Sequence, residues 1–475
     1  MKKSLLAGAL ALALSLTGMG AAYAHLTGSG NKIELTEDVI LGDPAAADGL
    51  TLNLNSQMVS GYLQLYSGTT LGGETSSRME FFPKGDPYRP PWINGIYLNL
   101  DHNFGMSTTG EILPEHDLVT RSVGKPVQAV ADRTKAGEKH TEIVRYADYY
   151  DRLWLASSIS LQYQDVRHYW DWENDSEEYG KKYQILEDMT EVFSFPVPED
   201  YALEITVTRD ENNRFRELNC NAANNEVDAE THYTDQGNWL YFIPELRLAD
   251  GSLMDYGGTP AGYGIYRLPI PGEGEYITID DLDMVYPLEE GWDVLNLQAD
   301  AVGEQLLLVT REEGQVLLRV LDMSTDPIPI RQTIPLDYTG EWYPYFYIYE
   351  DFVVVHGDEK AVFSRDENGL LRFEFSVPYL TEEQLGDEWE QYSGWGNANR
   401  TYAFDGQRLA GARMDYMTEP WYRDLNGALV EVYDRDGIQY MAHFHSSLDR
   451  NPIRSRGDNR ECRPGSHDAV TLTWN

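Results

Sequence analysis

The amino-acid sequence predicts an all-β protein, and three observations support that class. Helical periodicity is scarce, and its best candidates are two short segments, 182–189 and 381–392. Most of the chain instead alternates short runs of β-branched, aromatic and aliphatic residues with turns rich in Gly, Asp, Asn and Pro. In addition, a unit of two apolar runs and a more polar third run recurs in the C-terminal half.

The strands predicted in the first part of the chain are separated by turn residues. They have the β-branched and aromatic composition that is typical of strands, as WINGIYLNL and YALEITVT illustrate. In chain order they span 92–100, 152–163, 192–197, 201–208, 238–251 and 262–270.

The recurring unit is clearest at 304–325, EQLLLVTREEGQVLLRVLDMST, where two apolar runs flank a polar turn. Related patterns follow at 351–378 and 407–447, in steps of about fifty residues, a period typical of a β-propeller. A strand buried on both faces should be continuously apolar, so LLLV and FVVV are expected to be inner blade strands. The length then predicts a single propeller-like domain of about seven blades over residues 25–475.

A propeller ring must close, and closure commonly pairs strands from the two ends of the chain. The segments 32–41, KIELTEDVIL, and 469–475, AVTLTWN, are therefore expected to share one blade. Residues 125–190 fit the period less well and contain a charged insertion. The alternative architecture is a β-sandwich-like region up to about residue 230, followed by a partial propeller.

These repeats resemble the β-propeller superfamily of exported bacterial proteins. The likeness is one of architecture and implies no particular activity, since the sequence contains no WD40, kelch or quinoprotein signature. Nearer the N-terminus, GDPAAADGLTLNL at 42–54 resembles the start of the mature chain in uncharacterised exported proteins of Gram-positive gut anaerobes.

Residues 1–24 have the layout of a secretory signal peptide. A basic start at Lys2 and Lys3 precedes an apolar centre and the small-x-small exit AYA at 22–24. Cleavage before His25 is expected; the alternative is an uncleaved anchor, because 5–24 is close to the minimum length of a bilayer span. Either form predicts a secreted or extracytoplasmic protein associated with the cell envelope.

The formal net charge of −41 restricts the partners of the protein. Such a surface repels nucleic acid and anionic lipid, because phosphate binding requires clustered Lys and Arg. Membrane contact is therefore expected only through an uncleaved N-terminal segment. The Arg-rich stretch at 450–465 is interpreted as a clamp on the protein's own acidic surface, with docking of an anionic partner as the alternative. A monomer that binds an unknown protein or glycan is expected.

The sequence contains no HExxH, GxSxG, P-loop or CxxC motif, so no catalytic residue is nominated. We therefore expect a non-catalytic binding or sensing module of the cell envelope. The alternative is a hydrolase or lyase acting on a glycan, because carboxylates from separate blades of a propeller converge at its central funnel.

The candidate binding segment is RHYWDWENDSEEYGKKY at 167–183. Its aromatic rings suit stacking on sugars or apolar side chains, and its carboxylates suit hydrogen bonds from hydroxyl groups. Two further tyrosine-dense segments, 262–269 and 341–351, are interpreted as packing between blades. The nominated binding residues are Tyr169, Trp170, Asp171, Trp172 and Glu173.

No cofactor is assigned, but two patterns suit metal ions. His443 and His445 are two positions apart on a predicted strand, hence on one face, where they suit a transition metal; a solvated outer strand is the alternative. Acidic turns such as 364–371 suit calcium, although Asp, Asn and Gly in a hairpin turn explain them without a metal.

Two cysteines occur, Cys220 and Cys462, so the core must come from apolar burial rather than from a disulfide scaffold. The pair is either one disulfide between the middle of the chain and its C-terminal tail or two free thiols.

Overall fold

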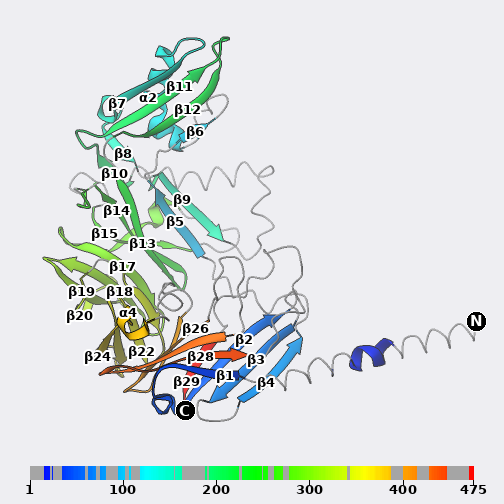
Figure 1. The fold of residues 1–475 in the computed structure, drawn as a ribbon. Coiled ribbons are helices and arrows are strands. Elements are labelled where there is room, and N and C mark those ends of the chain that lie inside the picture. The colour runs from blue at the N-terminus through cyan, green and yellow to red at the C-terminus, as the bar shows by residue number, and fades with distance from the viewer. Residues whose placement is uncertain are drawn as a thin grey trace, which may run out of the picture. The chain divides into compact units, whose positions relative to one another are not determined.

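In the computed structural model most of the described residues lie in β-strands, which confirms the predicted all-β class (Figure 1). The described residues gather in two compact units: unit 1 comprises Met1–Pro91 and Pro344–Asn475, and unit 2 comprises Trp92–Tyr343. The residues described are 15–21, 24, 35–58, 63–70, 75–81, 95–101, 106–108, 118–154, 156–162, 188–189, 192–223, 227–248, 250–254, 262–270, 278–339, 343–386, 400–414, 427–446 and 470–475.

The described part of unit 1 contains three antiparallel sheets. The first has the order β21 (Tyr345–Ile348), β22 (Phe352–His356), β23 (Glu359–Arg365), β24 (Leu371–Pro378). The second has the order β25 (Arg400–Phe404), β26 (Leu409–Met414), β27 (Gly427–Asp434), β28 (Gly437–Ser446), β1 (Leu35–Gly42). The third has the order β29 (Val470–Trp474), β2 (Leu50–Met58), β3 (Leu63–Thr70), β4 (Thr75–Phe81).

In unit 2 the described residues include two sheets of the same kind. One has the order β13 (Asp228–Gln236), β14 (Trp239–Arg247), β15 (Gly264–Pro269), β16 (Asp283–Pro287). The next has the order β17 (Asp293–Asp300), β18 (Gln305–Glu312), β19 (Gln315–Asp322), β20 (Ile330–Leu336). Two strand pairs accompany them: β5 (Gly95–Asp101) with β9 (Ala156–Gln162), and β8 (Arg152–Trp154) with β10 (Ser194–Pro196).

Meanders of four antiparallel strands in chain order are the blades of a propeller, so these sheets agree with the predicted fold class. Three sheets of the described residues are such meanders: β13–β16, β17–β20 and β21–β24. In a fourth sheet β1 is added to the meander β25–β28, and in a fifth β29 precedes β2–β4; the total of about seven blades stays a prediction. The apolar runs LLLV and FVVV lie in β18 and β22, which are the second strands of their sheets. Both are interior strands of their sheets and their apolar runs are buried, in agreement with the continuous apolar pattern.

The hairpin of β18 and β19 has a two-residue turn, Glu313-Gly314, in which both residues have positive φ, 47° and 84°. This is the backbone of a type I′ turn, whose twist matches that of the flanking strands. The turn of the recurring unit is therefore a structural feature, as its sequence indicates.

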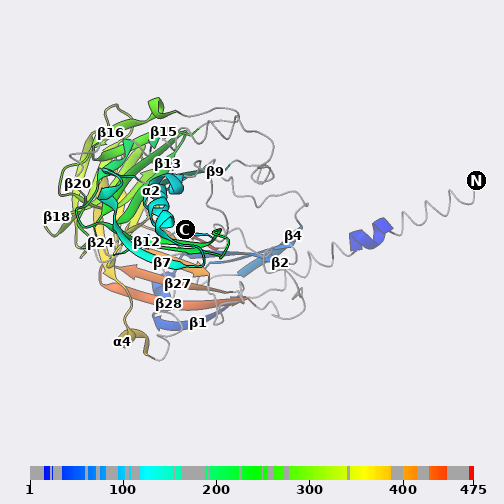
Figure 2. The same ribbon diagram turned by 90° about the horizontal axis from the view of Figure 1, so that it is seen from above.

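The terminal strands join two different sheets of unit 1. β29 pairs with β2, where Leu472 lies opposite Leu52, whereas β1 pairs with β28, where Leu35 lies opposite Ser446 (Figure 2). The prediction that 32–41 and 469–475 share one blade is thus wrong, although each end does pair with a segment from the other end of the chain. Gly42 ends β1 at φ 81°, where a Cβ atom would lie 2.0 Å from the carbonyl oxygen of Gln439.

The region between β5 and β13 departs from the propeller pattern. Helix α2 (Leu118–Arg133) packs on a sheet of the order β6 (Met106–Thr108), β12 (Phe215–Ala222), β11 (Ala202–Arg209), β7 (Lys139–Arg145). The charged insertion predicted at 125–190 is, in its described part, this helix and the strands that follow. Sequence reading missed the helix because of Gly124 and Pro126, although a helical stripe of buried residues marks it: Val123, Val127, Val130 and Ala131.

Of the two predicted helices, 381–392 begins as α4 (Glu382–Leu385) behind a capping box formed by Thr381 and Gln384. Only residues 188–189 of the segment 182–189 are described, and they are helical. No helix among the described residues is both long and apolar enough to cross a membrane.

We predict that Leu472→Ala destabilises unit 1 by about 2–5 kcal/mol, because a buried leucine is truncated in the sheet that joins the two ends of the chain. Leu472 is 6% exposed and belongs to the core of β2 and β26–β28. Denaturant unfolding followed by circular dichroism measures the loss. The matched control is Thr473→Ala on the exposed face of the same strand; an equal loss in both variants would contradict a role for the leucine side chain.

Candidate functional site

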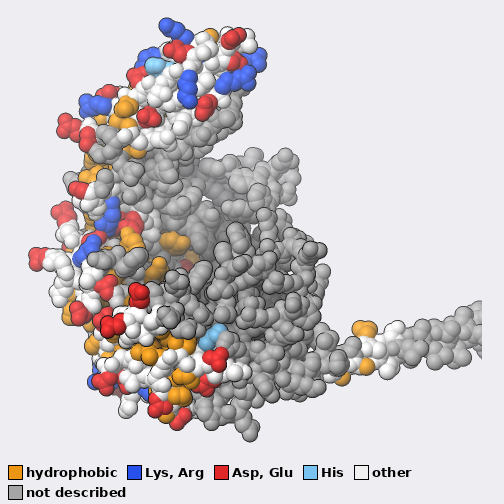
Figure 3. Space-filling model, viewed as in Figure 1, with side chains coloured by type: hydrophobic (Ala, Val, Ile, Leu, Met, Phe, Trp, Pro, Cys, Tyr) orange, Lys and Arg blue, Asp and Glu red, His pale blue; other side chains and the backbone are white. Residues whose placement is uncertain are grey.

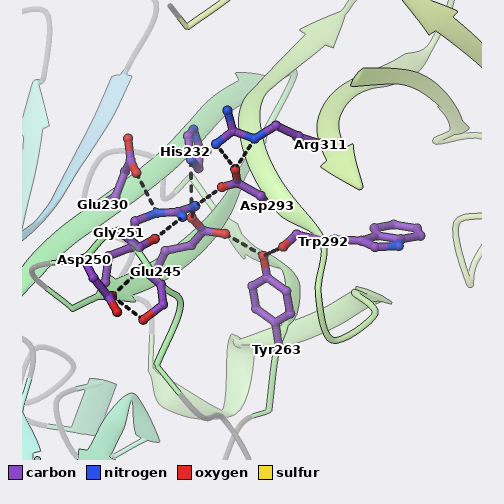
Figure 4. A network of polar contacts seen from close by, with 11 residues as sticks. Glu230, His232, Glu245, Asp250, Gly251, Tyr263, Trp292, Asp293 and Arg311 are labelled. Atoms are coloured by element: carbon purple, nitrogen blue, oxygen red, sulfur yellow. Dashed lines mark hydrogen bonds and ion pairs between the residues drawn. The ribbon is translucent and has the colours of Figure 1, made fainter. Parts of the chain in front are cut away.

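A partly buried network of carboxylates and arginines lies in unit 2, where β13 and β14 meet the start of β17 (Figure 4). We call it the Arg247 network. Its members are Glu230, His232, Glu245, Arg247, Tyr263, Asp293, Arg311 and Tyr343.

Strand alternation places the first four of these side chains on one face. Glu230 and His232 are two positions apart on β13, and Glu245 and Arg247 are two positions apart on β14. Glu230 lies directly opposite Glu245 in the antiparallel register, so both pairs point the same way.

The guanidinium of Arg247 is the centre of the network. Its Nη2 donates to Glu245 Oε2 at 2.5 Å and lies 2.6 Å from Asp293 Oδ1, while its Nε donates to Glu230 Oε2 at 3.1 Å. Its Nη1 donates to the carbonyl oxygen of Gly251 at 3.2 Å. Burial by itself lowers the pKa of Arg247, but the charges of Glu245 and Asp293 outweigh it and raise that pKa above its ordinary value.

The carboxylates have further partners. Glu245 is fully buried, and its Oε1 accepts a hydrogen bond of 2.5 Å from the hydroxyl of Tyr263. Asp293 Oδ2 accepts from Arg311, through Nε at 2.8 Å and through Nη2. The three carboxylates therefore face two guanidinium groups in a fixed hydrogen-bonded arrangement.

His232 and Tyr343 are the remaining members of the network, and they differ in solvent exposure. His232 is 8% exposed, and its Nε2 lies 3.8 Å from Glu245 Oε2. Tyr343 is 51% exposed, and its ring centroid lies 6.1 Å from that of His232. Partial burial, with the hydrogen bond to Glu230 and the charge of that carboxylate, raises the pKa of the Tyr343 hydroxyl.

Sequence reading missed this network because its residues come from separate strands. The segment DAETHYTDQ does show Glu230 and His232 at strand spacing, and PELR shows Glu245 and Arg247 likewise. These E-x-H and E-x-R patterns could have indicated the site from the sequence. They do not stand out, because the chain contains 78 Asp and Glu residues.

The predicted binding residues Tyr169, Trp170, Asp171, Trp172 and Glu173 lie outside the described residues. Among the tyrosine-dense segments, 262–269 is packed as predicted, with Tyr263 and Tyr266 buried. The segment 341–351 is packed only in part. Tyr343 and Tyr345 are exposed, whereas Tyr347 and Tyr349 pack against the core of their sheet.

His443 and His445 lie on β28, at alternate positions as predicted. β1 covers the edge of β28, with Asp38 opposite His443, and His443 is 3% exposed. The solvated outer strand considered as the alternative therefore does not apply to His443. The transition-metal site at this pair stays a prediction, because the side chain of His445 lies outside the described part of the chain.

Cys220 is buried on β12, where burial raises the pKa of its thiol to about 12. Its proposed disulfide partner, Cys462, lies outside the described residues, so the disulfide stays a prediction.

The acidic turns have structural roles. In the turn at 364–371, Asp366 Oδ1 accepts hydrogen bonds from the amides of Asn368 and Leu370, at 2.9 Å and 2.8 Å. Asp210 and Asp434 accept amide hydrogen bonds in their own turns in the same way. These contacts account for the acidic turns without a calcium ion.

A second polar centre lies in unit 1, between the sheet of β21–β24 and the sheet of β25–β28. Glu431 Oε2 lies 3.5 Å from Lys360 Nζ, 3.0 Å from Arg400 Nη1 and 2.9 Å from the hydroxyl of Tyr433. Lys360 is 1% exposed and also donates to the Tyr433 hydroxyl at 2.5 Å. Burial lowers the pKa of Lys360 to about 8, a stronger effect than that of Glu431, which raises it.

Beside this centre, His356 is fully buried between two tyrosines. Its Nε2 shares a hydrogen bond of 2.5 Å with the Tyr402 hydroxyl, and its Nδ1 shares one of 3.1 Å with the Tyr379 hydroxyl. Both ring nitrogens of His356 therefore have hydrogen-bond partners within the core of unit 1.

The comparisons with known proteins add no function. No protein-family profile matches the chain, and no curated protein does. Among solved structures, a putative 6-phosphogluconolactonase from Bacteroides uniformis shares 11% identity over 83% of this chain and 95% of its own, with a TM-score of 0.26. The WD40 domain of SCAP from fission yeast shares 8% identity over 86% of this chain and 79% of its own, with a TM-score of 0.21.

The dihydro-heme d1 dehydrogenase NirN shares 10% identity over 51% of this chain, with a TM-score of 0.22. The match spans only 44% of the length of that enzyme. At TM-scores this low, none of these likenesses bears on the site. The class of the protein therefore rests on its own sheets: it is an all-β protein of propeller-type blades.

We predict that Glu431→Gln destabilises unit 1 by about 3–5 kcal/mol, because it leaves Lys360 and Arg400 buried without their common anion. Lys360→Met should cost less, since Arg400 still neutralises Glu431 and methionine fills the space. Denaturant unfolding compares the two. Arg435→Ala, which removes an exposed partner of Glu374, is the control and should change little; equal losses in Glu431→Gln and Lys360→Met would contradict the asymmetry.

We also predict a pH dependence that belongs to Lys360. Its pKa is about 8 in the folded protein and returns toward the ordinary 10.5 on unfolding. Between these values the unfolded chain binds more protons, so the free energy of unfolding should rise with pH. Unfolding of the protein and of Lys360→Met, measured from about pH 7 to about pH 9.5, below the range where tyrosines titrate, tests this. A rise that persists in Lys360→Met would assign it to another group.

Proposed function

We propose that this protein is an extracytoplasmic, non-catalytic binding module that takes a neutral glycan at the cell envelope. The observation that supports the proposal is the half-exposed ring of Tyr343, which lies beside carboxylates already paired with arginines. Aromatic faces stack on sugar rings, and fixed charged groups around them give direction to hydroxyl hydrogen bonds.

The accessible part of the Arg247 network supplies such groups. The side chains of Glu230, Asp293 and Arg311 are 24%, 23% and 38% exposed, so each presents polar atoms to solvent while it is held by an ion pair. A ligand that meets these groups encounters oriented donors and acceptors, which need little reordering on binding.

The contacts of the glutamates favour binding over glycoside hydrolysis. Hydrolysis of a glycoside uses one carboxyl group as the acid and a second as base or nucleophile, in environments that separate their protonation. Arg247 contacts both Glu230 and Glu245, so the two carboxyl groups share one charged neighbour. A guanidinium shared in this way does not distinguish an acid from a base.

The charge of the protein favours a neutral ligand. The net charge is −41, and acidic side chains are scattered over the visible described surface rather than gathered in one place (Figure 3). Anionic wall polymers would meet repulsion over this surface, whereas a neutral glycan would not.

We predict that Tyr343→Ala weakens binding to a neutral cell-wall polysaccharide roughly tenfold, the upper range for one aromatic contact. Isothermal titration against a panel of neutral polysaccharides measures the affinity. Tyr345→Ala is the matched control, because that tyrosine is 55% exposed and makes no contact with Glu230 among the described residues.

Other outcomes of this experiment would overturn the proposal. Release of reducing ends from any polysaccharide of the panel would establish the hydrolase alternative. A loss of binding in Trp170→Ala and Trp172→Ala, with Tyr343→Ala unaffected, would place the ligand at the segment predicted from sequence. Binding to none of the polysaccharides would exclude a neutral glycan and favour a protein partner.

A further inference from the structure

His232 has a buried ring nitrogen that the proposed glycan contacts do not explain. The side chain is 8% exposed, and among the described residues its Nε2 has no hydrogen-bond partner. The atom lies 3.8 Å from Glu245 Oε2, which is too far for a hydrogen bond and close enough for two ligands of one ion (Figure 4). A buried polar atom without a partner costs about 1–3 kcal/mol, so its retention requires an explanation.

The surroundings of that nitrogen supply further ligand atoms. Glu230, His232 and Glu245 each offer one, and these three atoms all lie within 4.8 Å of one another. All three residues are on β13 and β14, which are paired over their full length, so the strands fix their spacing. Ligands on regular strands are positioned more rigidly than ligands on loops.

We propose that Glu230, His232 and Glu245 bind a divalent transition-metal ion of the zinc class. Imidazole nitrogen with carboxylate oxygen is a donor set that suits zinc, whereas calcium and magnesium prefer oxygen ligands alone. Three protein ligands leave a further position of a tetrahedral ion open to water or to a bound molecule.

The charges of the network are consistent with an added cation. Three carboxylates, Glu230, Glu245 and Asp293, face two guanidinium groups, which leaves one negative charge uncompensated. A divalent ion at His232 supplies positive charge at the place where the unused nitrogen lies.

Arg247 competes with the metal ion for two of the three ligand residues, because its Nη2 contacts Glu245 Oε2 and its Nε contacts Glu230 Oε2. Two other contacts do not involve the ligands: the same Nη2 contacts Asp293, and Nη1 donates to the carbonyl oxygen of Gly251. A metal ion on Glu245 therefore leaves Arg247 with Asp293 and Gly251 as partners, so its charge stays neutralised within the network.

The test uses the full exported chain without a tag, treated with a chelator and then dialysed against limiting ZnCl₂. We expect one zinc ion per chain by mass spectrometry of the metal, and a higher thermal midpoint with zinc than without. His232→Gln should weaken zinc binding at least about 100-fold, since it removes a direct ligand. Glu230→Gln, at a partly exposed position, should weaken it as well and provides a second variant if His232→Gln folds poorly.

His140→Gln is the matched control, because His140 Nε2 lies 3.4 Å from Glu142 on the surface of the same unit and should not affect zinc binding. X-ray absorption of the zinc complex should show nitrogen and oxygen ligands without sulfur. Absence of stoichiometric zinc would overturn the site. Unchanged binding by His232→Gln, with loss in His443→Ala, would instead assign the ion to the pair predicted on β28.

This inference stands apart from the glycan proposal, and the two fail separately. Polysaccharide titration of the zinc-free protein reports on Tyr343, whereas zinc dialysis without polysaccharide reports on His232.

Discussion

The contact between Arg247 and its three carboxylates is the interaction on which the polar site of unit 2 depends. Glu245 is fully buried, and a buried carboxylate without a partner cation costs several kcal/mol. Arg247 meets that requirement at 2.5 Å and also reaches Asp293 at the start of the next sheet. The same side chain thus neutralises Glu245 and joins two successive sheets.

The polar centre of unit 1 has more positive than negative groups, whereas the Arg247 network of unit 2 has more negative than positive groups. We assign the two centres different roles because of this difference. In unit 1 one carboxylate, Glu431, is shared by Lys360 and Arg400. The surplus positive charge is met by tyrosines, since the Lys360 ammonium lies 3.9 Å from the centre of the Tyr433 ring and donates to its hydroxyl. In unit 2 the surplus is negative, and it adjoins an imidazole nitrogen and an exposed ring. The first centre stabilises packing between sheets, whereas the second has the means to bind a ligand.

The sequence predicts the sheets of this protein better than it predicts the site. Apolar runs such as LLLV and the Glu313-Gly314 turn are local signals, and they identified β18, β19 and their hairpin correctly. The partners of the terminal strands are not local, so the prediction that these two strands share one blade was wrong. Helix α2 was missed because the valine stripe that defines it competes with Gly124 and Pro126, and burial of that stripe against a sheet outweighs their low propensity.

The site was not predictable for a related reason, which also bears on its function. Several of its residues lie at or beside the ends of strands: Arg247 is the last residue of β14, Asp293 is the first of β17, and Tyr263 directly precedes β15. Interior strand positions are fixed by the core that successive sheets share, whereas strand ends carry little of that constraint and are free to vary. A repeated sheet therefore determines where a site can form, while the side chains at its strand ends determine what binds. No motif records those side chains, because the fold assembles them from segments far apart in the chain.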